Sequence, residues 1–181
     1  MKTNPVVKCL LSGSLVLVFT AVMACSSGNS NHSDQHAGHE TSSSQVPAPT
    51  FKDAKATAVF EHYLHLKNAL VGSDAKEAQK GAAALQTALM KAGSTKGAEL
   101  AGKIASSSAL SVQRSQFDQL SAEVEKVVRA AKLAGGKIYK QHCPMANDGK
   151  GGNWLASEST VKNPYYGDDM LNCGSVEEEI K

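Results

Sequence analysis

This 181-residue sequence has little net excess of either charge, few aromatic residues and no long apolar run. The formal net charge is +2 with both signs present, so no strong electrostatic field points to a nucleic-acid partner. Aromatic residues make up only 5% of the chain while alanine is abundant, which favours helices that pack through small side chains. The apolar run at residues 10–23 is too short for a comfortable membrane-spanning helix.

The motifs of common enzymes are also missing. We find no Ser-His-Asp set, no phosphate-binding loop and no paired carboxylates arranged for catalysis. Cys143 follows His142, which leaves a thiol nucleophile open as an alternative, although neighbouring side chains often point apart. The sequence therefore predicts a protein without enzymatic activity.

Residues 1–24 have the organisation of an export signal. Lys2 and Lys8 accompany the apolar run, which is followed by a small residue, Ala24, directly before Cys25. This arrangement resembles the cleavage site of bacterial lipoproteins and predicts that Cys25 becomes the lipidated first residue of the mature chain. An ordinary signal peptide with an incidental cysteine is the alternative. In either case we expect export into an oxidising compartment, and a lipid would anchor the protein to the cell envelope.

Residues 25–52 are predicted to form a flexible tether, because small and polar residues dominate and apolar periodicity is missing. The tether contains His32, His36 and His39. Short histidine-rich tracts capture Zn, Cu or Ni loosely, so these residues are a candidate secondary metal site. A polar linker that happens to contain histidines is the alternative.

Residues 53–134 carry the apolar periodicity of four amphipathic helices. The first helix is expected to end at Gly72, the third to occupy about residues 96–105, and the fourth to stop at the glycine pair 135–136. Four such helices joined by short loops predict a mainly α protein built on an antiparallel four-helix bundle.

Residues 135–181 lack this periodicity and are predicted to form an irregular, glycine-rich lobe of short strands and turns, packed on the bundle. The lobe contains a set of imidazole, thiol and thioether groups: His142, Cys143, Met145, Met170 and Cys173. Thiolates and thioethers select Cu(I), whereas zinc accepts cysteine and histidine but has no use for methionine. The lobe is therefore a candidate Cu(I) site, with Ag(I) or Zn as alternatives.

A disulfide competes with the metal site for the same two residues. Cys143 and Cys173 lie beyond the leader and the lipidation site, in a chain expected to be exported to an oxidising compartment. A bond between them closes a loop of about thirty residues and contributes roughly 3–4 kcal/mol in the chain-entropy model. The two states can interchange, because a reduced pair binds metal and an oxidised pair does not.

Other charged residues and histidines are expected to be structural. His62 and His65 lie three positions apart on the first predicted helix, a spacing that can share a metal but more often marks surface histidines. The acidic run at residues 177–179 is expected to be a solvated face or a frayed tail.

Longer motifs point to a family. The runs YKQHCPMANDGKGGNWL (139–155) and NPYYGDDMLNCG (163–174) resemble the uncharacterised bacterial domain numbered 3347 among the domains of unknown function. The helical segment YLHLKNAL (63–70) is similar too, and the resemblance covers about residues 55–176. The sequence departs from the family pattern at Ala156, where serine is expected, and this position is not among the candidate ligands.

The resemblance implies heavy-metal handling, because the family occurs as exported lipoproteins and as a domain attached to periplasmic adaptor subunits of copper and silver efflux pumps. By position it implies the ligands already named: His142, Cys143, Met145, Met170 and Cys173. We therefore expect a lipid-anchored, periplasm-facing protein on the inner or outer membrane. It would buffer Cu(I) or Ag(I), or deliver the ion to an efflux adaptor or a cuproprotein. The alternative is a non-catalytic envelope interaction module stapled by a disulfide between the two cysteines.

Overall fold

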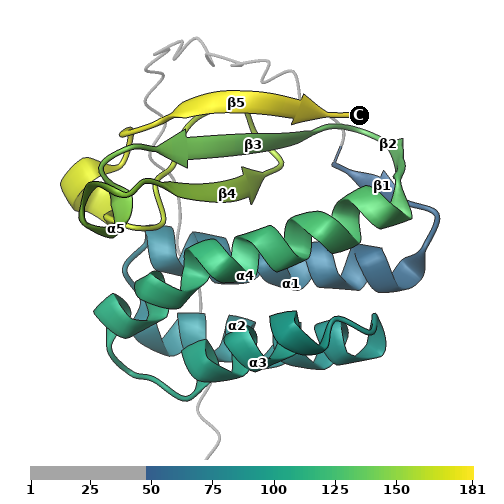
Figure 1. Cartoon of the computed structure of the whole chain (residues 1–181), viewed down its shortest axis with the longest axis horizontal. Coiled ribbons are helices and arrows are strands. Elements are labelled where there is room, and N and C mark those ends of the chain that lie inside the picture. Colours follow the sequence, from purple (N-terminus) through teal and green to yellow (C-terminus); the bar gives the residue numbers. More distant parts are fainter. Residues whose placement is uncertain (1–47) are drawn as a thin grey trace, which may run out of the picture. The chain divides into compact units, whose positions relative to one another are not determined.

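Four long helices dominate the computed structural model, which describes residues 48–181. α1 packs against α2 and α4, and α3 packs against α2 and α4, with α2 and α3 on the side away from the sheet (Figure 1). Within the described residues no helix combines the length and apolar character needed to cross a membrane. The expectation of a mainly helical protein is confirmed. The helices are α1 (Ala54–Val71), α2 (Ala75–Lys91), α3 (Thr95–Ala105) and α4 (Leu110–Ala131).

Short polar side chains set the helix starts. Asp53 accepts a hydrogen bond of 2.8 Å from the Lys55 N–H at the start of α1, and Asp74 accepts one of 2.8 Å from Glu77 at the start of α2. These bonds satisfy backbone amides that have no partner inside the helix. α4 ends before the expected glycine pair, because Lys132 takes a left-handed φ of 56° and the chain leaves the helix there.

The remaining described residues include two small antiparallel sheets, with turns and two short helical segments between strands. The short strands and turns expected for the C-terminal lobe are confirmed, but the strands pair in order and the lobe is less irregular than expected. One sheet pairs β1 with β2, and the other has the strand order β4-β3-β5. The three-stranded sheet lies over α4 with β4 packed against that helix (Figure 1). The strands are β1 (Thr50–Phe51), β2 (Leu133–Gly135), β3 (Ile138–Cys143), β4 (Gly152–Ala156) and β5 (Ser175–Ile180).

Two of these strands lie where the sequence suggested unpaired chain. β1 falls inside the predicted tether, yet it pairs with β2 directly after α4. The acidic run belongs to β5 and pairs with β3 instead of fraying. Glu178 is bonded to Arg129 of α4 at 2.5 Å and Glu179 to Lys137 at 2.6 Å, so neighbouring cations compensate the like charges.

A row of aromatic rings crosses the core and joins the helices to the sheets. Successive ring centroids lie 5.4–6.3 Å apart, the spacing of favourable aromatic pairs. The row begins in β1 and ends in β4, so apolar contact is continuous between these elements. In order, it consists of Phe51, Phe60, Tyr63, Phe117, Tyr165 and Trp154.

The hydroxyl of Tyr63 links three elements of the core through hydrogen bonds. It accepts a hydrogen bond from the Leu155 N–H of β4 at 3.0 Å and lies 2.7 Å from the Ser121 hydroxyl of α4. Ser121 in turn donates to the Phe117 carbonyl at 2.8 Å, so the Tyr63 hydroxyl donates to Ser121. Burial raises the pKa of Tyr63 well above its ordinary value, which keeps the hydroxyl protonated as a donor.

A buried ion pair fastens the segment after β4 to α1. Lys67 is 1% exposed and its Nζ lies 2.5 Å from Oε1 of Glu158. Burial lowers the pKa of Lys67, and Glu158 partly offsets that shift. Burial by itself raises the pKa of Glu158, but the hydrogen bond and charge of Lys67 overcome it and hold the pKa below its usual value. Gln141 of β3 also donates to the Glu158 carbonyl, at 2.9 Å.

Substitution of Tyr63 by phenylalanine is expected to lower the free energy of unfolding by about 1–3 kcal/mol, because the buried Leu155 N–H loses its acceptor. Urea denaturation measures the change. Tyr139→Phe is the matched control, since within residues 48–181 the Tyr139 hydroxyl makes no side-chain hydrogen bond. The control should stay within about 0.5 kcal/mol of the parent. Equal losses in both variants would contradict the role of the Tyr63 hydroxyl.

Glu158→Gln should cost about 2–4 kcal/mol, because it leaves the Lys67 cation buried without its anion. The double variant Lys67→Met, Glu158→Gln should return to within about 1 kcal/mol of the parent, since no buried charge remains. A carboxylate with a lowered folded pKa stabilises the fold above its unfolded pKa and loses that effect as the pH falls. The difference between parent and Glu158→Gln should therefore shrink below about pH 4. A double variant as unstable as the single one would exclude this account.

Candidate dithiol site

The structure brings Cys143 and Cys173 together, with their sulfur atoms 2.8 Å apart. Both are free thiols. Cys143 is the last residue of β3 and is fully buried, whereas Cys173 lies just before β5 and is partly exposed. A disulfide has an S–S distance of about 2.05 Å, so the two atoms are in hydrogen-bond contact without a covalent bond.

The pairing of β3 with β5 places the second thiol beside the first. His142 is the register partner of Ser175, so the chain that enters β5 passes the end of β3. Gly174 makes this close approach possible with a φ of 136°. A Cβ atom at that position would lie only 2.5 Å from the His142 carbonyl oxygen, which excludes larger residues.

Asn163 holds the segment between β4 and β5, which contains no strand and carries Cys173 near its end. Its side chain is fully buried, donates to the Cys173 carbonyl at 2.8 Å and accepts from the Tyr165 N–H at 2.8 Å. The second bond is the local turn that an Asn-Pro pair favours. Asn163 was not among the predicted site residues.

Arg114 of α4 fixes the same segment from the helical side. Its Nε donates to the Pro164 carbonyl at 3.0 Å and its Nη2 to the Leu70 carbonyl of α1 at 3.0 Å. Burial lowers the pKa of Arg114, and Asp169 opposes that shift. The guanidinium thus connects the end of α1 with the loop that carries Cys173.

Cys173 is held as a neutral thiol. Its pKa lies above the ordinary value, first because of the hydrogen bond with Cys143 and then because of desolvation and the charge of Cys143. The backbone of Met145 acts in the opposite direction and lowers this pKa. A raised pKa gives no support to a nucleophilic thiol, which depends on the thiolate.

His142 is separated from the thiols. Successive side chains of a strand point to opposite faces, so His142 and Cys143 diverge along β3. The His142 Nδ1 lies 3.1 Å from the Asn153 Oδ1 and 3.9 Å from Glu177 Oε1. Within residues 48–181 no three His, Cys, Asp or Glu side chains come together as a metal-ligating group.

The other predicted ligands are either exposed or outside the described residues. Met145, two residues after Cys143, and Met170, three residues before Cys173, are 52% and 36% exposed. His65, predicted to be a surface residue, bonds to Glu77 at 2.8 Å and is about half exposed. The lipidation site and the secondary metal site lie outside the described residues: Cys25, His32, His36 and His39.

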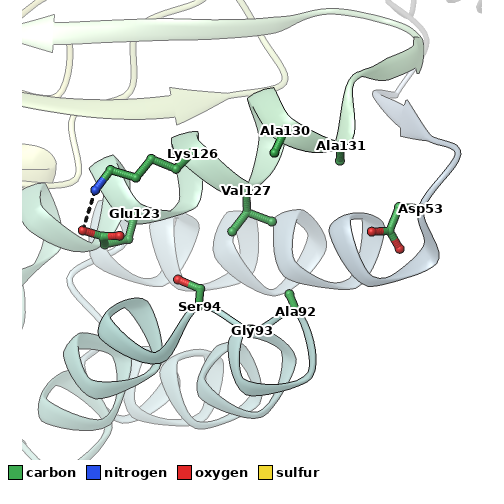
Figure 2. Close-up of a pocket in the computed structure, with 9 residues that line it drawn as sticks. All are labelled: Asp53, Ala92, Gly93, Ser94, Glu123, Lys126, Val127, Ala130 and Ala131. Atoms are coloured by element: carbon green, nitrogen blue, oxygen red, sulfur yellow. Dashed lines mark hydrogen bonds and ion pairs between the residues drawn. The ribbon is translucent and has the colours of Figure 1, made fainter.

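A hollow of about 400 Å³ between the start of α1, the α2–α3 turn and α4 is a weaker candidate (Figure 2). Its lining includes Val127, alanines and the carboxylate of Glu123. Lys126 at 2.9 Å and Lys96 at 3.3 Å already neutralise Glu123, whose pKa is lowered, first of all by its hydrogen bond to Lys126. No thiol, thioether or imidazole lines this hollow, so it does not suit a soft metal.

The described part of the chain is a small, mainly helical protein with an appended antiparallel sheet that carries a pair of thiols. Residues 59–136 match a family model described as a protein of unknown function, DUF3347. The match supports the family resemblance over the helices, and it ends before β3, so the two cysteines lie beyond the matched residues. Neither a curated protein nor a solved structure matches the chain.

Asn163→Ala is expected to speed the alkylation of Cys143 by about tenfold or more, because losing buried hydrogen bonds of about 1–3 kcal/mol each promotes local opening. The measurement is the rate of thiol labelling in the full chain carrying Cys9→Ser and Cys25→Ser. Asn68→Ala, at an exposed position of α1, is the control and should label like the parent. Equal labelling rates in all three proteins would show that Asn163 does not hold the segment closed.

Proposed function

We propose that this protein is an exported, lipid-anchored carrier of a soft heavy-metal ion, Cu(I) or Ag(I), held by Cys143 and Cys173. The observation that supports the proposal is the meeting of two thiols from elements thirty positions apart in the chain. Thiolates are the ligands that Cu(I) prefers, and low coordination suits a two-sulfur site. The ion is cargo that the protein buffers or delivers, not a resident cofactor.

The spacing of the two sulfur atoms suits capture by a small movement. With metal–sulfur bonds of about 2.3 Å, a bridging ion needs the sulfurs roughly 4–4.6 Å apart, the upper value for a linear two-coordinate ion. The observed distance is 2.8 Å, so Cys173 would move outward by about 1–2 Å while buried Cys143 stays in the core. Because the pKa of Cys173 is raised, its proton must leave to solvent when the ion binds, and the apparent affinity should rise with pH.

The ligand set favours Cu(I) or Ag(I) over zinc. A structural zinc site needs four nitrogen, sulfur or oxygen ligands, and His142 lies on the other face of the sheet. Met145 and Met170 adjoin the thiols and supply the thioethers that zinc does not use.

We further infer that the four helices act as an antiparallel bundle that serves as a rigid base for this site. The proposed lipid on Cys25 would hold the protein at the periplasmic face of the envelope. The partner would be a heavy-metal efflux adaptor or a cuproprotein, and the histidines of the tether would collect ions more loosely. The leader and the family resemblance support these inferences.

A second candidate function is a non-catalytic interaction module stapled by a disulfide between the cysteines. The observation that favours it is again the sulfur distance, since closing from 2.8 Å to about 2.05 Å needs less movement than admitting a metal. Such a bond would stabilise the lobe by about 3–4 kcal/mol in the chain-entropy model.

Anaerobic titration with Cu(I) against a chromophoric chelator tests the proposal. The full chain in detergent, with Cys9→Ser and Cys25→Ser, keeps only the two candidate thiols. We expect one tightly bound ion, lost on either Cys143→Ser or Cys173→Ser. Alanine at His32, His36 and His39 is the control and should leave this ion in place while removing loosely bound ones.

Two results would reject the metal carrier. The first is Cu(I) binding that persists after both cysteines are replaced. The second is no tight binding by the reduced parent, together with a protein that is purified without reductant as a disulfide and loses stability on reduction. The second result would establish the stapled module.

A further inference from the structure

The methionines of the described chain are unusually exposed. Large apolar side chains are normally buried, yet Met90, Met145 and Met170 are 64%, 52% and 36% exposed. Two of the three adjoin the thiol pair. The third lies near the end of α2, on an element that does not contribute to the site.

Both methionines lie close to the thiols in the chain. Met145 follows Cys143 by two positions, and the Met170 carbonyl accepts a hydrogen bond from the Cys173 N–H at 3.0 Å. The Tyr166 hydroxyl donates to the Met145 carbonyl at 2.6 Å, which links the turn α5 (Ala146–Gly149) to the short helix η1 (Gly167–Met170). These two segments lie together at one end of the sheet (Figure 1).

The burial of the two thiols defines a direction of entry. Cys143 is fully buried and Cys173 is partly exposed, so an ion from solvent meets the side of Cys173 first. The exposed, flexible side chains of Met145 and Met170 belong to the two segments that carry the thiols, two residues after Cys143 and three before Cys173. A thioether is a soft ligand with no proton to lose, whereas a thiol binds such an ion as the thiolate.

We propose that Met145 and Met170 form a thioether port, which binds Cu(I) or Ag(I) first and passes it to the dithiol. This inference rests on the proposed function. The step is a ligand exchange: each metal–thioether bond is replaced by a metal–thiolate bond, and each thiol proton goes to solvent. The metal stays monovalent, so no oxidant or reductant is needed. In delivery the same steps run in reverse.

The port predicts a kinetic effect without an equilibrium effect. In the full chain with Cys9→Ser and Cys25→Ser, the double variant Met145→Leu, Met170→Leu should load and release Cu(I) about tenfold more slowly. Its Cu(I) affinity at equilibrium should change by less than about threefold, because the thiols keep the ion. Stopped-flow exchange with a chromophoric Cu(I) chelator gives the rates, and competition with the same chelator gives the affinity.

Met90→Leu is the matched control, since it removes an exposed thioether far from the thiols in the chain and should leave both quantities unchanged. Leucine has nearly the volume of methionine and the sites are exposed, so folding should be preserved, and thermal unfolding checks this. Unchanged exchange rates in the double variant, with Cu(I) still bound, would overturn the port alone. A large loss of affinity would also overturn it, because the methionines would then be permanent ligands. A reduced parent that takes up no Cu(I) would overturn the proposed function and the port together.

Discussion

The position of the sheet on the helices depends on one buried oxygen, the hydroxyl of Tyr63. It connects α1, α4 and β4 by accepting from Leu155 and donating to Ser121. The Leu155 N–H belongs to an edge strand, so without this acceptor it would be buried and unpaired at a large cost. Because β4 is fixed in this way, its neighbour β3 is fixed as well, and β3 ends at Cys143. The Tyr63 hydroxyl therefore helps to position the buried thiol, which lies eighty residues later in the chain.

The position of Cys173 is held less firmly than that of Cys143. The segment after β4 packs Tyr165 into the core, and polar contacts from other elements hold its backbone at separate points: Lys67 binds Glu158, and Arg114 binds the Pro164 carbonyl. Segments held mainly by a few polar contacts open at lower free energy than packed helices. On the proposed function, Cys173 would therefore be the thiol that moves when an ion binds, while Cys143 remains in the core.

The helices were accessible from the sequence because their signals are local. Apolar periodicity and the break at Gly72 depend on residues within a few positions of one another. The sheet was not accessible for the opposite reason. β3 pairs with β5 across more than thirty positions, and its first two residues, Ile138 and Tyr139, are both buried, which hides the alternation of a strand. The acidic run of β5 also resembles a solvated tail until Arg129 and Lys137 are placed beside it.

The candidate site also combines features that the sequence predicts with features that depend on long-range contacts. Chemistry alone pointed to Cys143 and Cys173 as a pair, since either a metal or a disulfide needs both. The separation of His142 could not be read from the motif, because it follows from the strand conformation of residues that were expected to be irregular. Asn163 was missed because its partner is a backbone carbonyl ten positions away.

The sulfur distance finally explains why one pair of residues suits two states. At 2.8 Å the thiols lie between a disulfide at about 2.05 Å and a metal-bridged pair at roughly 4–4.6 Å. The disulfide would need the sulfurs to approach by about 0.8 Å, and the metal-bridged pair would need them to separate by about 1–2 Å. On the proposed function, the redox poise of the compartment and the supply of metal, more than the scaffold, decide which state the pair adopts.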